Sequence, residues 1–196
     1  MCGRYDLNET GTRIAAVFRV LRQVPLFEPH PDLRPTDKAP IVRLGKDGQR
    51  EAILMRWGFK PPFATGGTDR INARGESVAT AYRDAYRNRR CLVPASAFFE
   101  WSGEKGGKTK WRVTVRDKPL FAFAGLWDWW RDPKDPDAAP LAAFTIITTA
   151  PNDLLSDIHD RMPVIVDEED FDAWLHTGSA SLLRPMPSEA IELAKA

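Results

Sequence analysis

Strand patterns follow one another through the middle of this chain, and this feature constrains the fold most. They cover 90–101 ("RCLVPASAFFEW"), 110–116 ("KWRVTVR"), 120–127 ("LFAFAGLW") and 141–150 ("LAAFTIITTA"). Apolar runs and period-two alternation bounded by turn residues are typical of strands. Helical patterns occur only at irregular intervals, without βαβ alternation. We therefore predict one α+β domain over residues 1–196, with a curved, largely antiparallel sheet and a barrel-like core flanked by helices.

Helices and further strands are predicted around this central region. Apolar residues recur at helical spacing in three segments: 10–21, where Ile14, Val17, Phe18 and Leu21 share a face, 76–90, and 167–178, which ends at Gly178. A hairpin is predicted at 39–57 around Asp47-Gly48, a short helix at 151–160 and a strand at 162–166. The tail 179–196 is expected to pack on the surface.

Composition excludes some functional classes. Hydrophobic residues make up 43% of the chain and charged residues 28%, which is typical of a globular protein. The net charge is +1, so overall charge gives no argument for nucleic-acid binding. No apolar run approaches the roughly 20 residues that span a bilayer, and no signal-peptide pattern is seen. We predict a monomeric cytoplasmic protein with no membrane partner.

The chain opens with "MCGRY", which places a cysteine directly after the initiating methionine. Removal of Met1 would leave Cys2 with a free α-amine and a thiol on adjacent carbons. Reference pKa values near 8 and 8.5 make both groups partly available as nucleophiles at neutral pH. The other cysteine, Cys91, fits a small buried strand residue. Two cysteines and three histidines without ligand spacing predict no metal site, and no cofactor is expected.

Other residues have the chemistry of a catalytic or binding site, although each also has a structural interpretation. Glu100 ends an apolar run, where burial would raise its pKa and suit it to proton transfer, or where it simply reaches solvent. His159 lies between a predicted helix and strand, as a general acid or base or as a surface residue. Asn72 and Arg74, in "INARGES", can bind phosphate or form the turn before a helix in which Ser77 is a cap.

Six motifs occur in a fixed order: "MCGRY", "RWGF", "INARGES", "RRCLVPASAFFEW", "TIITTAPN" and "IHDRMPVIV". Together they closely resemble the SRAP family (SOS response-associated peptidases) of abasic-site-processing proteins, from Cys2 to about Val166. The resemblance implies covalent capture of abasic sites in single-stranded DNA. The amine of Cys2 would form a Schiff base with the sugar aldehyde, and its thiol would close a thiazolidine ring. It also implies autoproteolytic removal of Met1, a strand-cleaving lyase side activity, and association with the nucleoid when DNA is damaged.

The resemblance also implies roles for individual residues. Asn72 would orient the Cys2 terminus, Glu100 would shuttle protons, and His159 would help to open the sugar ring. The DNA-binding positions implied by the same motifs are Arg4, Arg74 and Arg161, which would hold phosphates, and Trp57, which would stack on or wedge beside a base.

One segment departs from the family pattern, and two other functions are considered. Where the family often has Asn-x-Ala-Pro-Thr-Gln, this chain reads "DLRPTD", with Asp32, Arg34 and Asp37 at the changed positions. One alternative is a glutamine amidotransferase, because N-terminal-nucleophile enzymes of that class also begin Met-Cys-Gly. The other is a non-catalytic single-strand binder that uses the tryptophans of "GLWDWW" as a stacking platform instead of packing them in the core.

Overall fold

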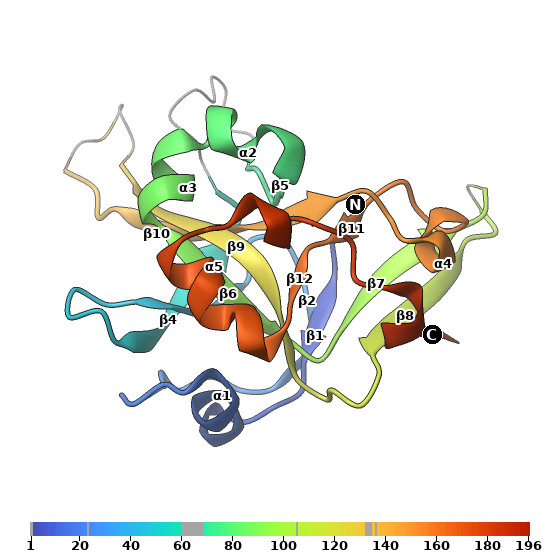
Figure 1. Ribbon diagram of the computed structural model, residues 1–196, viewed down its shortest axis with the longest axis horizontal. Helices are drawn as coiled ribbons and strands as arrows, with labels where there is room; N and C mark the ends of the chain where they lie inside the picture. The colour runs from blue at the N-terminus through green and yellow to red at the C-terminus, as the bar shows by residue number, and fades with distance from the viewer. Residues whose placement is uncertain (1, 23, 60–68, 105, 132–134, 136) are drawn as a thin grey trace.

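The computed structural model describes residues 2–22, 24–59, 69–104, 106–131, 135 and 137–196. Met1 and parts of the predicted loops at 103–108 and 131–140 lie outside the described residues. The chain folds as a single α+β domain of mostly antiparallel strands in two sheets, with a few helices, as the sequence predicts (Figure 1).

Five strands of the larger sheet close into a barrel. They are β3 (Lys38–Leu44), β4 (Arg50–Trp57), β6 (Arg90–Ala95), β9 (Phe121–Trp130) and β10 (Leu141–Thr149). The circuit runs β10–β4–β3–β6–β9 and returns to β10, with one parallel pair, β10 and β4. Three short strands extend it: β5 (Asn72–Arg74), β11 (Met162–Pro163) and β12 (Ile165–Val166). Most residues of β6, β9 and β10 are buried on both faces of the sheet, which explains the nearly continuous apolar segments.

A second, five-stranded sheet has the order β13-β8-β7-β1-β2. Its strands are β1 (Tyr5–Leu7), β2 (His30–Leu33), β7 (Ala97–Ser102), β8 (Thr109–Val115) and β13 (Ile191–Lys195). The tail is therefore an edge strand paired with β8, because Ile191 and Leu193 continue the alternation of that sheet. The prediction of a surface-packed segment missed this pairing.

The single strand predicted at 90–101 is wrong, because it is two strands that belong to different sheets. Ser96 separates them: its backbone N–H donates to Asp6 O at 2.9 Å, and its Oγ accepts from the backbone N–H of Asn8 at 3.1 Å. These bonds turn the chain out of the barrel and into the second sheet. The residues on both sides of the turn are buried, so hydropathy alone gives no sign of it.

The helices cover the outside of the sheets, with α2 and α3 above and α1 below in the view of Figure 1. Their bounds are α1 (Gly11–Phe18), α2 (Gly75–Ala81), α3 (Arg83–Asn88), α4 (Asp153–Ser156) and α5 (Phe171–His176). Short 3-10 turns occur at Glu168–Asp170, Ala180–Leu182 and Ser188–Ala190. None of the helices in the described ranges is long and apolar enough to cross a membrane.

Helix ends differ from the sequence predictions for local reasons. Thr10 caps α1 by accepting from the backbone N–H of Arg13, but Arg19 adopts a left-handed conformation that ends the helix, so Leu21 is 82% exposed. The helix predicted at 76–90 breaks at Tyr82 into α2 and α3. Gly178 follows α5 as predicted, with φ of 61°.

Candidate functional site

Cys2 lies beside the strand that carries Glu100. Strands β1 and β7 are antiparallel with Tyr5 opposite Phe98, and the backbone N–H of Phe99 donates to Arg4 O at 2.9 Å. Continuing this register toward the start of the chain brings Cys2 next to the end of β7. The Cys2 side chain is fully buried, and its Sγ lies 3.7 Å from Arg4 O.

Asn72 holds the backbone of Cys2. It begins β5, which pairs in parallel with the second half of β10, where Ile146 is its partner. Its Nδ2 donates to Cys2 O at 2.9 Å. Its Oδ1 is buried and accepts no hydrogen bond from the described part of the chain. A buried amide with an open acceptor fits a site that receives another donor, because an unsatisfied buried polar atom is costly.

Glu100 is the buried carboxyl of the site. Its side chain is on β7 and only 3% exposed. Burial raises its pKa from 4.5 to about 7, and the charge of Asp160 acts in the same direction. The pKa of the Cys2 thiol is also raised, first by burial and then by the negative charge of Glu100. A carboxyl group with a pKa near neutral pH therefore interacts electrostatically with a thiol that is protonated at neutral pH.

His159 lies where it was predicted, between α4 and β11. Its Nδ1 accepts from the backbone N–H of Arg161 at 3.0 Å, and it also lies 2.8 Å from Asp160 Oδ1. The first contact needs an unprotonated Nδ1 and the second a protonated one. Burial lowers the pKa of His159, so the neutral imidazole, which forms no ion pair with Asp160, is favoured at pH 7. We assign the hydrogen bond from the backbone N–H of Arg161 to Nδ1, and this assignment places the proton of the neutral ring on Nε2.

Strand β10 brings Asn72 and the His159 segment together. β5 runs along one edge of its second half, and β11 pairs with Thr148 and Thr149 on the other edge. The influence of Asp160 on the pKa of Glu100 shows that the His159 segment also lies within electrostatic range of β7. Four segments far apart in the sequence thus contribute Cys2, Asn72, Glu100 and His159 to one region.

The three arginines that are predicted to bind phosphates differ in exposure and in their ion pairs. Arg161 is 12% exposed and forms a bidentate pair with Glu76 at 2.6 and 2.8 Å, and its Nη2 donates to Thr148 O. Arg4 is paired with Asp32. Arg74 is exposed at the start of α2, where it is the N-cap residue. Ser77 is not the cap, because its Oγ donates to Arg74 O and accepts nothing there.

Trp57 does not have the surface position that base stacking requires. Its side chain is 1% exposed and packs between Tyr5, at 5.2 Å between ring centroids, and Phe144, at 6.5 Å. Its Nε1 donates to Ile71 O at 2.9 Å. A strand-end tryptophan is amphipathic, so sequence alone does not distinguish a core indole with a satisfied N–H from a base-stacking one.

Replacing Trp57 by Phe should therefore reduce stability and leave DNA chemistry unchanged. The change removes one ring from the core and one of the two hydrogen bonds that Ile71 O accepts, leaving the one from the backbone N–H of Ile146, and it should cost roughly 1–3 kcal/mol. Urea unfolding would show a lower midpoint, while the reaction with DNA at 20 °C would keep the wild-type rate. A loss of DNA affinity without a change in the midpoint would contradict the core assignment.

Three polar residues around the site have no functional role that the sequence predicts. Asp32 stands out in the sequence only as a departure from the family pattern, and its pairing with Arg4 has no local cause. Glu76 and Thr148 are the partners of Arg161. The arginines Arg4 and Arg161 that these three contact lie 28, 85 and 13 positions away along the chain, so no local signal marks these contacts.

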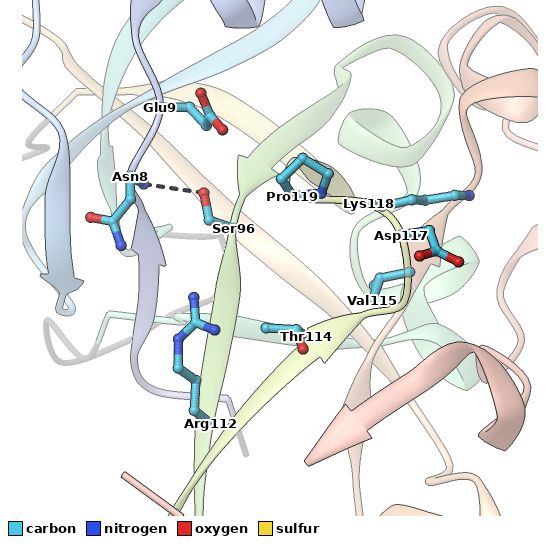
Figure 2. A pocket seen from close by; sticks show the side chains of 9 residues that line it. All are labelled: Asn8, Glu9, Ser96, Arg112, Thr114, Val115, Asp117, Lys118 and Pro119. Atoms are coloured by element: carbon cyan, nitrogen blue, oxygen red, sulfur yellow. Dashed lines mark hydrogen bonds between the residues drawn. The ribbon is translucent and has the colours of Figure 1, made fainter. Parts of the chain in front are cut away.

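An open groove of about 450 Å³ lies at the opposite end of β1 from Cys2. Figure 2 shows Asn8, Ser96 and Arg112 on one side of it and the Asp117–Pro119 turn on the other. None of the predicted site residues lines it. Among the described residues, no group of three or more His, Cys, Asp or Glu side chains is arranged to hold a metal ion.

Comparison with known sequences agrees with the motifs at this site. The family model described as SOS response associated peptidase (SRAP) matches residues 1–196, and the chain belongs to this family. It is 35% identical over 205 residues to the abasic site processing protein YoqW of Bacillus subtilis, covering 98% of this chain and 90% of that protein. It is 28% identical to the abasic site processing protein HMCES of Gallus gallus, covering 89% of this chain and 65% of that protein.

Solved structures show the same fold. A crystal structure of a protein from Bacteroides thetaiotaomicron superimposes with a TM-score of 0.85 at 27% identity, covering 99% of this chain and 91% of that one. A protein from Bordetella bronchiseptica superimposes with a TM-score of 0.82 at 24% identity, which supports the fold alone. The relatives that match over most of this chain are thus named abasic site processing proteins.

Proposed function

We propose that this protein captures abasic sites in single-stranded DNA covalently, through Cys2 after removal of Met1. The observation that carries the proposal is the hydrogen bond from Asn72 to Cys2 O beside the buried carboxyl of Glu100. A terminal aminothiol, an amide that orients it and a proton-transfer group are what aldehyde capture needs. The substrate class comes from the names of the relatives.

The chemistry proceeds in two steps that together release one water molecule. The open abasic sugar carries an aldehyde at C1′, and the Cys2 amine attacks this carbon and expels water to form a Schiff base. The Cys2 sulfur then adds to the same carbon, and the thiol proton ends on the ring nitrogen. The second step is intramolecular, so the effective concentration of the thiol is very high.

The surrounding residues have separate roles in this proposal. Glu100 accepts a proton from the Cys2 amine or thiol and returns it to the departing water, which suits a pKa of about 7. His159 donates its Nε2 proton toward the ring oxygen of the closed sugar. The open acceptor Asn72 Oδ1 fits an N–H of the new Cys2 terminus, while its Nδ2 holds Cys2 O.

Two related activities use the same groups. A Schiff base acidifies the adjacent C2′ position, and loss of that proton with departure of the 3′ phosphate cleaves the strand. Removal of Met1 by the site itself would generate the reactive terminus. We propose both as activities secondary to capture.

A specific observation favours a second candidate, plain single-strand binding. Trp129 is 49% exposed, and the guanidinium of Arg43 lies 4.0 Å from the ring centroid of the neighbouring Trp127. An exposed indole beside cations can stack on bases. Such binding would not depend on Cys2 or on DNA damage. The amidotransferase alternative is disfavoured, because the family match covers the whole chain.

The test is a denaturing gel with intact-mass analysis. Protein whose Met1 is confirmed absent by mass is mixed with a single-stranded oligonucleotide carrying one abasic site, beside the undamaged oligonucleotide. We expect a heat-stable adduct with the abasic oligonucleotide only, at the summed mass less one water. Retention of both oligonucleotides on a native gel, with no adduct on the denaturing one, would instead support plain binding.

A further inference from the structure

Arg4 lies two residues after Cys2, and its guanidinium is paired with a carboxylate. Its Nε and Nη2 contact Asp32 Oδ1 and Oδ2, both at 2.5 Å, in a bidentate pair. One face of the guanidinium lies 5.7 Å from the ring centroid of Trp101. The two paired side chains are 29% and 25% exposed, so DNA can reach the pair from solvent.

Asp32 has a second cationic partner, Arg34. The Nε and Nη2 of Arg34 donate to Asp32 Oδ2 at 2.9 and 2.7 Å. Arg34 is 61% exposed. The pKa of Asp32 is lowered, first by the hydrogen bond from Arg4 and also by that from Arg34, so the carboxylate is charged at neutral pH.

We propose that Asp32 is a positioning residue that competes with the DNA backbone for Arg4. The proposal rests on the proposed function, in which a strand with an abasic site lies over Cys2. The forked edge of a guanidinium binds a carboxylate or a phosphate with the same geometry, and it cannot bind both at once. A phosphate that flanks the lesion therefore displaces Asp32 from Arg4.

Arg34 makes this exchange feasible. When a phosphate takes Arg4, the carboxylate of Asp32 keeps its two contacts with Arg34 and is not left unpaired. The Arg4–Asp32 pair also holds the Arg4 side chain over Trp101 before DNA arrives. Asp32 thus keeps Arg4 ordered beside Cys2 and weakens the binding of strands that place a phosphate on Arg4, because they must displace it.

The proposal predicts that Asp32→Asn binds DNA more tightly than the wild type. The neutral amide cannot compete with a phosphate, so binding should tighten by about two- to fivefold at 150 mM salt, the upper part of the range for a partly exposed ion pair. Each additional phosphate contact on a single strand would steepen the plot of log K against log salt by about 0.7. Arg4 contacts the same phosphate in both complexes, so the slope of the variant should stay close to that of the wild type.

Fluorescence anisotropy with a single-stranded oligonucleotide that carries a tetrahydrofuran abasic analogue measures this without any covalent step. The matched control is Asp47→Asn, because Asp47 is an exposed carboxylate paired with Arg22 in the β3–β4 turn. It removes the same charge away from Cys2. Arg4→Gln and the double variant Arg4→Gln/Asp32→Asn complete a mutant cycle. We expect tighter binding for Asp32→Asn alone, and no gain from it when Arg4 is absent.

Equal or weaker binding by Asp32→Asn, or the same gain in Asp47→Asn or in the Arg4→Gln background, would overturn the role of Asp32. Crosslinking of the wild type to the aldehyde-bearing oligonucleotide, run in parallel, reports on the proposed function separately. An adduct together with unchanged Asp32→Asn affinity rejects only the competition. If no variant forms an adduct or binds the oligonucleotide, both the competition and the proposed function are rejected.

Discussion

Replacing Cys2 by Ser should abolish the heat-stable adduct with abasic DNA while leaving an unstable one. The serine keeps the α-amine, so the Schiff base still forms, but its hydroxyl is a far poorer nucleophile for ring closure. We expect the yield of heat-stable adduct to fall on the order of a hundredfold or more. Serine is close to cysteine in size, so the buried pocket of Cys2 is retained.

Borohydride reduction gives this prediction a clear readout. In Cys2→Ser, reduction before denaturation should trap the Schiff base and restore the adduct. In the wild type, reduction should change little, because the thiazolidine is already stable. Cys91→Ser is the matched control, since Cys91 is equally buried but lies on β6, and it should crosslink as the wild type does. A stable, unreduced adduct in Cys2→Ser would show that the sulfur is not required.

The strands of the middle of the chain could be predicted from the sequence, because their patterns depend on neighbouring residues. Alternation of Val113 and Val115 in β8, and the Asp47-Gly48 turn between β3 and β4, have local causes. The break at Ser96 could not be predicted, because residues on both sides of it are equally buried. Its position depends on hydrogen bonds to Asp6 and Asn8, some 90 residues earlier.

The candidate site shows the same division. The residue types at Cys2, Glu100 and His159 are enough to indicate nucleophilic and proton-transfer chemistry. Their mutual positions depend on long-range strand pairing: β1 with β7 brings Cys2 beside Glu100, and β10 aligns β5 and β11 along its two edges. The carboxylate at Asp32 is visible in the sequence as a substitution, but its pairing with Arg4 depends on β1 lying against β2 in the register that places Tyr5 opposite Leu33.

Replacing Glu100 by Gln should slow crosslinking by about 10²- to 10⁴-fold, the range for losing a positioned acid–base group. The amide cannot accept a proton from the Cys2 amine or thiol. The thiol depends on such an acceptor, because burial raises its pKa well above neutral. The rate constant is measured in single-turnover reactions with the abasic oligonucleotide, using excess mature protein.

The pH dependence identifies the group responsible. The carboxylate is the reactive form, so the wild-type rate should rise as pH increases through about 7, the pKa of Glu100. Glu100→Gln should lose this inflection and keep only the one near pH 8 that belongs to the α-amine. An inflection near 7 that persists in the variant would assign the proton transfer to another group.

As pH rises, the free energy of unfolding of the wild type should fall while its crosslinking rate rises. This contrast separates an effect on catalysis from an effect on folding. The folded-state pKa of Glu100 is raised from 4.5 to about 7, so the unfolded chain releases this proton first as pH rises. The wild type therefore loses stability between about pH 4.5 and 7, by up to roughly 3 kcal/mol, and Glu100→Gln does not. Urea unfolding at pH 4.5 and pH 8 should show the stability of Glu100→Gln rising relative to the wild type by about this amount. A variant that is slower and loses stability relative to the wild type between pH 4.5 and pH 8 would mean that Glu100 supports the fold as an ionised group, and the proton-transfer assignment would fail.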